Sequence, residues 1–288
     1  MESKLDTEAL AALGHPGRLA VFRLLARRAP QGVQPSEIAE ALGMKRNTLS
    51  VHVMTLARAG LVTQRRAGKA AYYALDLTRT AALVDFLVND CCRGRPELCT
   101  PLAATALRRL DTGDPPMPDR PYNVLFICTG NSARSIFAEA ILRDLGGDRF
   151  RALSAGTRPY SELNPFALEV LRQAGHDVSA LRSKNVAEFQ GAEAPALDFV
   201  FTVCDRAANE ECPPWPGQPI TAHWGVPDPV KAEGTEAERA LAFRRAYDAM
   251  RRRIECFVEL PIDSLDRMSL QRKLDRIDAD AATDAKAG

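Results

Sequence analysis

One stretch decides the fold of the larger part of this chain: Val124-Leu125-Phe126-Ile127-Cys128-Thr129-Gly130-Asn131-Ser132-Ala133-Arg134-Ser135. An apolar run ends at Cys128, a small polar loop follows, and a helical pattern starts near Arg134. This order predicts a buried strand, a loop whose backbone N–H groups converge, and a helix N-terminus at the same point. Such a loop binds a tetrahedral oxyanion, which Arg134 can grip with two nitrogens.

The positive field of this loop also acts on Cys128. It stabilises a thiolate, so we predict a nucleophilic cysteine with a lowered pKa. The alternative is a buried structural cysteine at a strand end. The C-x5-R-S pattern directly after an apolar strand favours the nucleophile.

Composition indicates an ordinary globular protein. With 288 residues, 46% of them hydrophobic, the chain is long enough for two domains with separate cores. The net charge of +1 conceals an asymmetry, because the first 90 residues hold 12 Lys and Arg against 8 Asp and Glu, and the rest hold 26 against 29. A basic N-terminal part is compatible with nucleic acid. The polar N-terminus and the lack of a long apolar run predict a cytoplasmic protein with no membrane partner.

A proline-rich segment, 112–121, predicts a linker, because proline lacks an amide donor and resists helix and central strand. Before it, 1–111 has the pattern of short helices followed by a hairpin, a mainly α winged helix-turn-helix domain. After it, 122–278 alternates strand and helix, which predicts a three-layer α/β domain with a four-stranded parallel sheet. The small, charged residues 279–288 are expected to form a flexible tail.

The expected elements of the second domain are strands at 123–128, 150–155, 199–203 and 220–222 and helices at 135–145, 165–174, 236–258 and 264–277. In the first domain, Ser36 is expected to cap a short helix. Leu49, Val53 and Leu56 lie on one face of a helix at 46–59. A hairpin at 61–66 and 70–75 and a helix at about 77–89 follow.

Helix, turn, helix and basic hairpin together define a winged helix. The helix at 46–59 carries polar residues in its N-terminal half, the end that a recognition helix inserts into the major groove. The hairpin carries basic residues that can reach phosphates. The alternative is a solvated helix face and a charged turn, but the assembled pattern favours DNA binding. The candidate DNA-binding residues are Arg46, Asn47, Thr48, Ser50, His52, Arg65, Arg66 and Lys69.

Residues 5–100 resemble the ArsR/SmtB family of arsenic-responsive repressors. The resemblance depends on ALGHPGRL at 12–19, NTLSVH at 47–52, LARAGLV at 56–62 and the hairpin. It implies a homodimer that binds a palindromic operator and releases it when a soft ion binds. His52 matches a position that the family uses in DNA recognition. His15 is expected to cap or turn between helices.

Cys91, Cys92 and Cys99 close this domain, and two adjacent thiols with a third after a Gly/Pro turn can surround one trigonal ion. Thiolates are soft ligands, which favours arsenite, As(III), as the effector. Some arsenite repressors of the family resemble this arrangement, although the C-x-C pair that many of them carry before the recognition helix is absent from 35–43. The alternatives are small apolar side chains at a helix end, or cadmium, antimonite or zinc as the ion.

Residues 121–277 resemble the low-molecular-weight protein tyrosine phosphatases and, within that fold, the arsenate reductases. Besides the C-x5-R-S loop, Ser154-Ala155-Gly156-Thr157 and Asp228-Pro229 carry the resemblance. It implies that Asp228 is a general acid and that Asn131 and Ser135 order the loop and hydrogen-bond the sulfur. The expected oxyanion-binding residues are Thr129, Gly130, Asn131, Ser132, Ala133 and Ser135, with Arg134.

Two features favour a reductase over a phosphatase. Cys204 ends the third expected strand and Cys212 follows, and a relay of thiols can supply the two electrons that reduction requires. Val230 and Lys231 follow Asp228-Pro229, where tyrosine phosphatases usually place aromatic residues that hold a phenol ring.

The predicted thiol cascade starts when Cys128 attacks arsenate. Cys204 then attacks Cys128 and expels arsenite, and Cys212 attacks Cys204 to give the last disulfide. Thioredoxin or glutaredoxin reduces it, and no permanently bound cofactor is expected. Thioredoxin-coupled reductases usually space the last pair one residue closer, so a glutathione-dependent route through Cys128 and Cys204 remains an alternative. Cys256 is expected in the core.

The sequence thus predicts a bifunctional arsenic-resistance protein, an arsenite-responsive repressor fused to an arsenate reductase. Its expected partners are operator DNA, arsenate, arsenite, the reductant and a second copy of the chain. One alternative is a regulator whose phosphatase-like domain only senses arsenate or phosphate. Another is a protein tyrosine phosphatase tethered to DNA.

Overall fold

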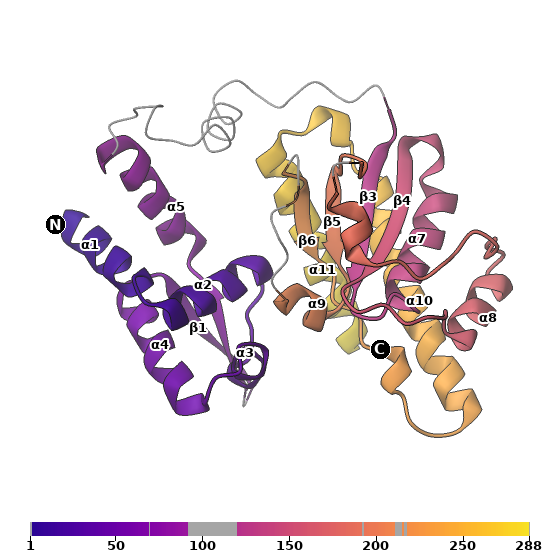
Figure 1. Cartoon of the computed structure of the whole chain (residues 1–288), viewed down its shortest axis with the longest axis horizontal. Coiled ribbons are helices and arrows are strands. Elements are labelled where there is room, and N and C mark those ends of the chain that lie inside the picture. The colour runs from indigo at the N-terminus through magenta and orange to yellow at the C-terminus, as the bar shows by residue number, and fades with distance from the viewer. Residues whose placement is uncertain are drawn as a thin grey trace. The chain divides into compact units, whose positions relative to one another are not determined.

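The computed structural model describes residues 2–68, 70–91, 120–191, 193–210, 215 and 218–287. The chain divides into two compact units, Met1–Asp114 and Pro115–Gly288 (Figure 1). Residues 112–119 of the predicted linker lie outside the described residues, as do Lys69, Cys92, Cys99 and Cys212. None of the described helices is long and apolar enough to cross a membrane.

The first unit has the predicted helix-turn-helix followed by a hairpin. Its elements are α1 (Glu2–Leu13), α2 (Pro16–Arg28), α3 (Pro35–Ala41), α4 (Arg46–Arg58), β1 (Val62–Ala67), β2 (Ala70–Leu75), α5 (Leu77–Asp85) and a π-helical turn, η1 (Phe86–Cys91). The two strands are antiparallel, with Val62 opposite Leu75 and Ala67 opposite Ala70. The buried face of α4 includes Leu49, Val53 and Leu56, as predicted.

Local chemistry sets the helix starts of this unit. His15 caps α2, since its Nδ1 accepts from the backbone N–H of Gly17 at 3.1 Å, and Pro16 takes the first helical position. The prediction that Ser36 caps α3 is wrong. Pro35 already occupies the first turn there, and Gln34 is the N-cap residue without a side-chain bond.

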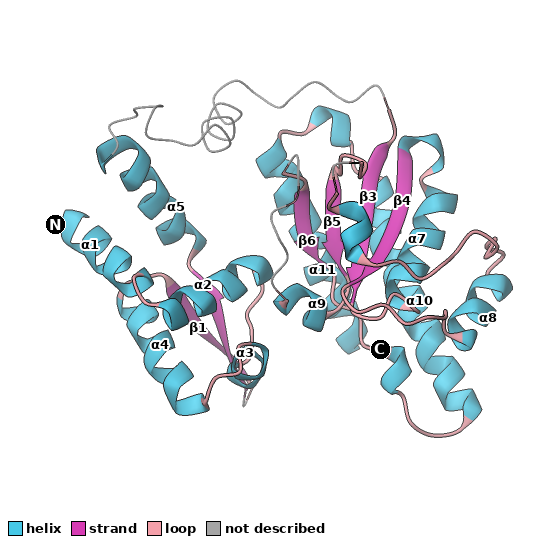
Figure 2. Ribbon diagram, viewed as in Figure 1, coloured by secondary structure: helices cyan, strands magenta, loops and turns pink. Residues whose placement is uncertain are grey.

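The second unit contains, among its described residues, a parallel sheet with strand order β4-β3-β5-β6. The strands are β3 (Tyr122–Cys128), β4 (Phe150–Gly156), β5 (Phe199–Thr202) and β6 (Ile220–His223). Helices surround the strands, as Figure 2 shows, and give the predicted α/β fold. They are α7 (Arg134–Leu145), α8 (Pro165–Gln173), α9 (Asp205–Asn209), α10 (Glu236–Val258) and α11 (Arg267–Ala287), with short 3-10 turns at η3 (Gly147–Arg149), η4 (Val186–Phe189), η5 (Pro229–Lys231) and η6 (Ile262–Ser264).

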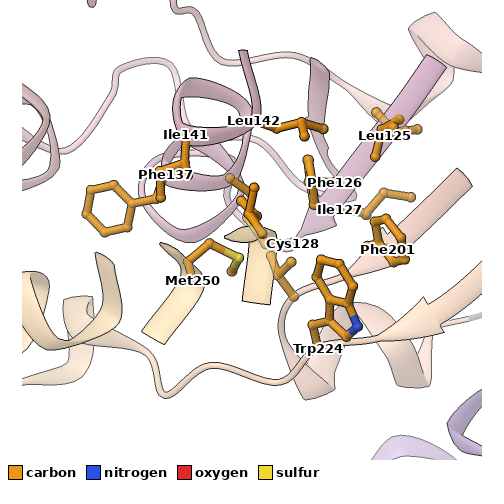
Figure 3. Packing of buried hydrophobic residues seen from close by; sticks show 14 of the residues in the cluster. Leu125, Phe126, Ile127, Cys128, Phe137, Ile141, Leu142, Phe201, Trp224 and Met250 are labelled. Atoms are coloured by element: carbon orange, nitrogen blue, oxygen red, sulfur yellow. The ribbon is translucent and has the colours of Figure 1, made fainter. Parts of the chain in front are cut away.

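The core of this unit is built around β3, whose seven residues are all buried. A strand that is buried along its whole length and mostly apolar is typical of a parallel sheet covered on both faces. The Phe126 and Phe201 rings lie 5.6 Å apart, and Phe201 stacks on Trp224 at 4.0 Å (Figure 3). Close packing therefore fixes the carboxyl ends of β3 and β5, where Cys128 and Cys204 lie.

Two features of the C-terminal region differ from the sequence-based expectation. The last helix was expected to end at 277, but α11 continues to Ala287, because this alanine-rich stretch contains no glycine or proline before Gly288. Cys256 is exposed, whereas Arg253 takes a buried position on α10. The buried residues of α10 follow helical spacing and are Phe243, Ala246, Tyr247, Met250, Arg253, Ile254 and Phe257.

Candidate active site and candidate DNA interface

The candidate active site is the loop between β3 and α7. Its backbone carbonyls point to the segment after β4, because Thr129, Gly130 and Ser132 accept from Arg158, Tyr160 and Asn164 at 2.9, 3.0 and 3.0 Å. This is the arrangement in which the N–H groups of a loop can point inward at an anion, next to the N-terminus of α7.

Two residues of the loop have unusual backbone surroundings. Asn131 adopts φ 43°, a left-handed conformation that asparagine tolerates better than most residues. Gly130 lies under the ring of Tyr160, where a Cβ atom would come within 2.4 Å of the ring. A larger residue at position 130 would therefore require the exposed Tyr160 ring to move. Tyr160, which is 60% exposed, was missed by the sequence analysis.

The Cys128 sulfur is buried and hydrogen-bonded. It lies 2.9 Å from the Ser135 Oγ and accepts from the Asn131 backbone N–H at 3.1 Å. These are the contacts that the resemblance implied for both residues.

Burial nevertheless raises the pKa of the Cys128 thiol above its ordinary value, and the neighbouring Cys204 raises it further. The hydrogen bonds of Ser135 and the charge of Arg134 act in the opposite direction. The prediction of a lowered pKa is therefore wrong for this structure. The loop field is present, but the cost of placing an isolated thiolate in the core outweighs it.

A buried polar network supports the loop from below. Asn131 Nδ2 donates to Ser135 Oγ at 2.8 Å and to Ser154 Oγ at 2.9 Å, and Asn131 Oδ1 accepts from the Lys184 N–H at 2.7 Å. Ser154 donates to Glu139 at 2.5 Å, and the Lys184 ammonium pairs with Glu139 at 2.8 Å. Sequence analysis missed Glu139 and Lys184. Glu139 follows Ser135 by four residues on α7, a spacing that places both on one helix face.

Arg134 and Asp228 meet at the loop. The Arg134 guanidinium lies 2.9 Å from the Asp228 carboxylate and donates to the Val226 carbonyl at 3.2 Å. Asp228 also accepts from the Val230 N–H at 3.2 Å and thereby caps η5. The structure thus brings together a guanidinium and a carboxylate that lie far apart in the sequence.

A second thiol lies beside the loop. Val203 N–H donates to the Ile127 carbonyl at 2.8 Å, so the chain after β5 continues next to Cys128. The buried Cys204 sulfur lies 3.5 Å from Thr129 Oγ1 and accepts from the Ala207 N–H at 3.4 Å as the N-cap of α9. Cys212 lies outside the described residues.

The candidate DNA interface is the outer face of α4 together with the hairpin. Arg46, Asn47, Thr48 and Ser50 are exposed on α4, and Arg65 and Arg66 are exposed on β1. Val51 and Met54, 63% and 54% exposed, share the α4 face but were missed because they are apolar.

His52, which was also predicted to bind DNA, does not lie on this exposed face. It belongs to the buried side of α4, three residues after Leu49, and its ring lies 4.8 Å from that of His15. Its Nδ1 is buried and has no hydrogen-bond partner among the described residues. Burial, with smaller effects of His15 and Arg18, lowers the pKa of His52.

Of the predicted sensor cysteines, only Cys91 lies within the described residues, exposed at the end of η1. Within these residues, no group of three or more His, Cys, Asp and Glu side chains is placed to hold a metal ion.

Comparisons with known proteins agree with the two units. Residues 123–273 match the low molecular weight phosphotyrosine protein phosphatase family, and residues 13–65 match a helix-turn-helix domain. The chain belongs to the low molecular weight phosphotyrosine protein phosphatase family and carries a helix-turn-helix domain before that part.

Its relatives include proteins named arsenate reductase. That of Halalkalibacterium halodurans is 38% identical and that of Bacillus licheniformis 40% identical, each over 136 residues that span 47% of this chain and 94% of the relative. A solved arsenate reductase in its phosphate-binding state is 26% identical, with a TM-score of 0.40 over 48% of this chain and 96% of that one.

Proposed function

We propose that the second unit is an arsenate reductase. The observation that carries this proposal is the buried Cys204 sulfur 3.5 Å from Thr129 Oγ1, the residue after Cys128. Phosphate ester hydrolysis requires one nucleophilic thiol, whereas reduction of arsenate requires two electrons from a pair of thiols. The names of the relatives at 38% and 40% identity support the same reaction.

The first step is a substitution without a change in oxidation state. Arsenate binds in the loop against Arg134, and the Cys128 thiolate attacks As(V). Asp228 acts as the general acid and gives a proton to the departing hydroxyl group, which leaves as water. The pair of Asp228 with Arg134 at 2.9 Å supports this placement of the acid.

The second step is the reduction. The Cys204 thiolate attacks the Cys128 sulfur, the sulfur–arsenic bond breaks, and its electron pair stays on arsenic, which leaves as arsenite. The two thiols are thereby oxidised to the Cys128–Cys204 disulfide. Attack of Cys212 on Cys204 releases the Cys128 thiolate, and thioredoxin or glutaredoxin reduces the resulting Cys204–Cys212 disulfide. In the second candidate route, glutathione reduces the Cys128–Cys204 disulfide directly, without Cys212.

For the first unit we propose an arsenite-responsive repressor that acts as a homodimer. The helix-turn-helix match over residues 13–65 and the exposed polar face of α4 support operator binding. Arg65 and Arg66, with Lys69 outside the described residues, would contact phosphates. Arsenite bound by Cys91, Cys92 and Cys99 would release the operator.

One coupled assay tests the reductase. Arsenate, NADPH, thioredoxin and thioredoxin reductase are mixed with the full chain, Cys128→Ser or Cys204→Ser, and Cys256→Ser serves as a control for an exposed cysteine. We expect NADPH oxidation with wild type and the control, and loss with both other variants. Aryl phosphate hydrolysis that survives Cys204→Ser, without arsenate-dependent NADPH oxidation, would indicate a phosphatase instead.

A further inference from the structure

A buried ion pair joins α10 to α11, and the reaction steps above do not use it. Arg253 and Asp278 are only 5% and 7% exposed. The guanidinium donates to Asp278 Oδ1 through Nε at 3.0 Å and Nη2 at 2.9 Å. It also donates to the Ala249 carbonyl at 2.9 Å and, through Nη2, to the Gly225 carbonyl at 3.2 Å. Asp278 therefore fixes the direction in which Arg253 reaches Gly225.

Gly225 belongs to the segment that carries the candidate acid. Trp224 and Val226 on either side of it donate to the Thr202 and Val203 carbonyls at 2.8 and 3.3 Å, so this segment runs beside the end of β5. The carbonyl of Val226 accepts from Arg134, and Asp228 follows two residues later. The Gly225 carbonyl is thus held by Arg253, and the next carbonyl along the chain holds Arg134.

The space next to the Cα atom of Gly225 is also occupied. A Cβ atom there would lie 3.0 Å from His223 Nε2 and 3.5 Å from Asp205 Oδ1. These two side chains contact each other at 3.0 Å, and Asp205 begins α9 directly after Cys204. Gly225 is therefore confined between Arg253 and the start of the element that carries the second thiol.

Energetics favours a role in geometry over a role in stability. A buried ion pair contributes little more to stability than apolar side chains of the same volume, because desolvation cancels most of its attraction. What apolar residues cannot replace is a directed donor to the Gly225 carbonyl.

We propose that Arg253 and Asp278 are positioning residues that hold residues 225–228 so that Arg134 and Asp228 face the anion. This inference deepens the proposed reductase function and depends on it for the reaction. Asp278 lies beyond residues 123–273, the part that matches the phosphatase family. Arg253 lies within that part, on α10, and its counter-ion is thus supplied by the C-terminal helix α11.

The main test variant is the apolar pair Arg253→Met with Asp278→Leu in the full chain. We expect its thermal midpoint to stay near that of wild type, while Asp278→Asn alone lowers the midpoint because it leaves a buried cation without its counter-ion. Arg251→Met is the matched control. Arg251 lies on the same helix in a surface pair with Glu255, and its replacement should change nothing.

The kinetic test measures kcat and asks whether the effect of the apolar pair depends on Asp228. In the apolar pair we expect kcat for arsenate to fall about tenfold or more, as misplacement of a catalytic group does. Asp228→Asn should then reduce kcat much less in the apolar pair than in wild type, because the acid is already displaced. The proposal would be overturned if the apolar-pair variant is stable, has the kcat of wild type, and loses as much kcat on Asp228→Asn as wild type does.

Phosphate binding tests the positioning role of Arg253 and Asp278 independently of the proposed reductase reaction. Calorimetry with inorganic phosphate reports the geometry of Arg134 without turnover, and we expect weaker binding to the apolar pair. If wild type reduces no arsenate but phosphate affinity falls in this variant, the reaction is wrong and the positioning stands. Unchanged phosphate affinity together with unchanged kcat would leave Arg253 and Asp278 with a structural role only.

Discussion

A thiol attacks only after it loses its proton, and Cys128 lies in the core, where burial raises its pKa. Ser135 is the largest of the contributions that lower that pKa. The reactivity of Cys128 as the proposed nucleophile thus depends on a balance between its burial, which raises its pKa, and a few contacts that lower it.

Arsenate reduction should therefore rise with pH until the thiol is ionised. Ser135→Ala removes a contribution that lowers the pKa, so its pH–rate profile should move to higher pH. At pH 7 we expect kcat/KM to fall about fivefold, the value of one hydrogen bond of roughly 1 kcal/mol. Profiles of wild type, Ser135→Ala and the exposed control Ser161→Ala check this. Coincident profiles would mean that the thiolate form of Cys128 does not limit the rate.

His52 leads to a prediction about stability. Its pKa is lowered in the folded state, so below the ordinary value of 6.5 the unfolded chain binds more protons than the folded one. Stability of the first unit should fall as the pH drops below about 6.5. His52→Phe should remove that dependence while operator binding persists. Thermal unfolding and gel shifts at pH 5.5 and 7.5 measure both. A large loss of operator affinity in the variant at pH 7.5 would restore the base-contacting role.

At the scale of elements, the hairpin and α4 should contribute differently to DNA binding. Arg66 is exposed on β1, and we predict that it contacts a phosphate. Arg66→Ala should weaken binding to all sequences alike and reduce the salt-dependence slope by about 1. Titrations of specific and random DNA at several salt concentrations give both quantities. A loss confined to the specific sequence would place Arg66 at a base edge.

On α4, the exposed Met54 suits a thymine methyl group. Met54→Ala should lower affinity for the selected operator by about tenfold, within the 1–3 kcal/mol typical of base discrimination, and leave non-specific binding unchanged. Replacement of operator thymines by uracil should weaken wild type and have little further effect on the variant. If uracil lowers the operator affinity of wild type and of Met54→Ala equally, Met54 does not contact the methyl group.

The prediction for the whole molecule follows from the presence of both units in one chain. With a thioredoxin system, arsenate should release the operator from wild type, because the second unit converts it into arsenite. Cys128→Ser should respond to arsenite but not to arsenate, and Cys256→Ser should respond to both. A gel shift with a promoter fragment measures these responses. Release of Cys128→Ser by arsenate would instead support a domain that only senses the oxyanion.

Local patterns in the sequence were sufficient for the strands of the parallel sheet. The apolar run before Cys128 and the strand–helix alternation predicted all four described strands of the sheet within about two residues. They also predicted the loop, because its residues are contiguous. Periodicity, capping and turn chemistry act over a few residues, so a single sequence displays them.

Only the tertiary structure decided which side chains are buried and which distant groups meet. It buried His52 and Arg253, exposed Cys256, and raised the pKa of the cysteine whose loop the sequence had predicted. It also joined Lys184 to Glu139 and Asp278 to Arg253, pairs that lie 45 and 25 residues apart. Desolvation and ion pairing depend on every element that packs around a group, and that environment exists only once the chain has folded.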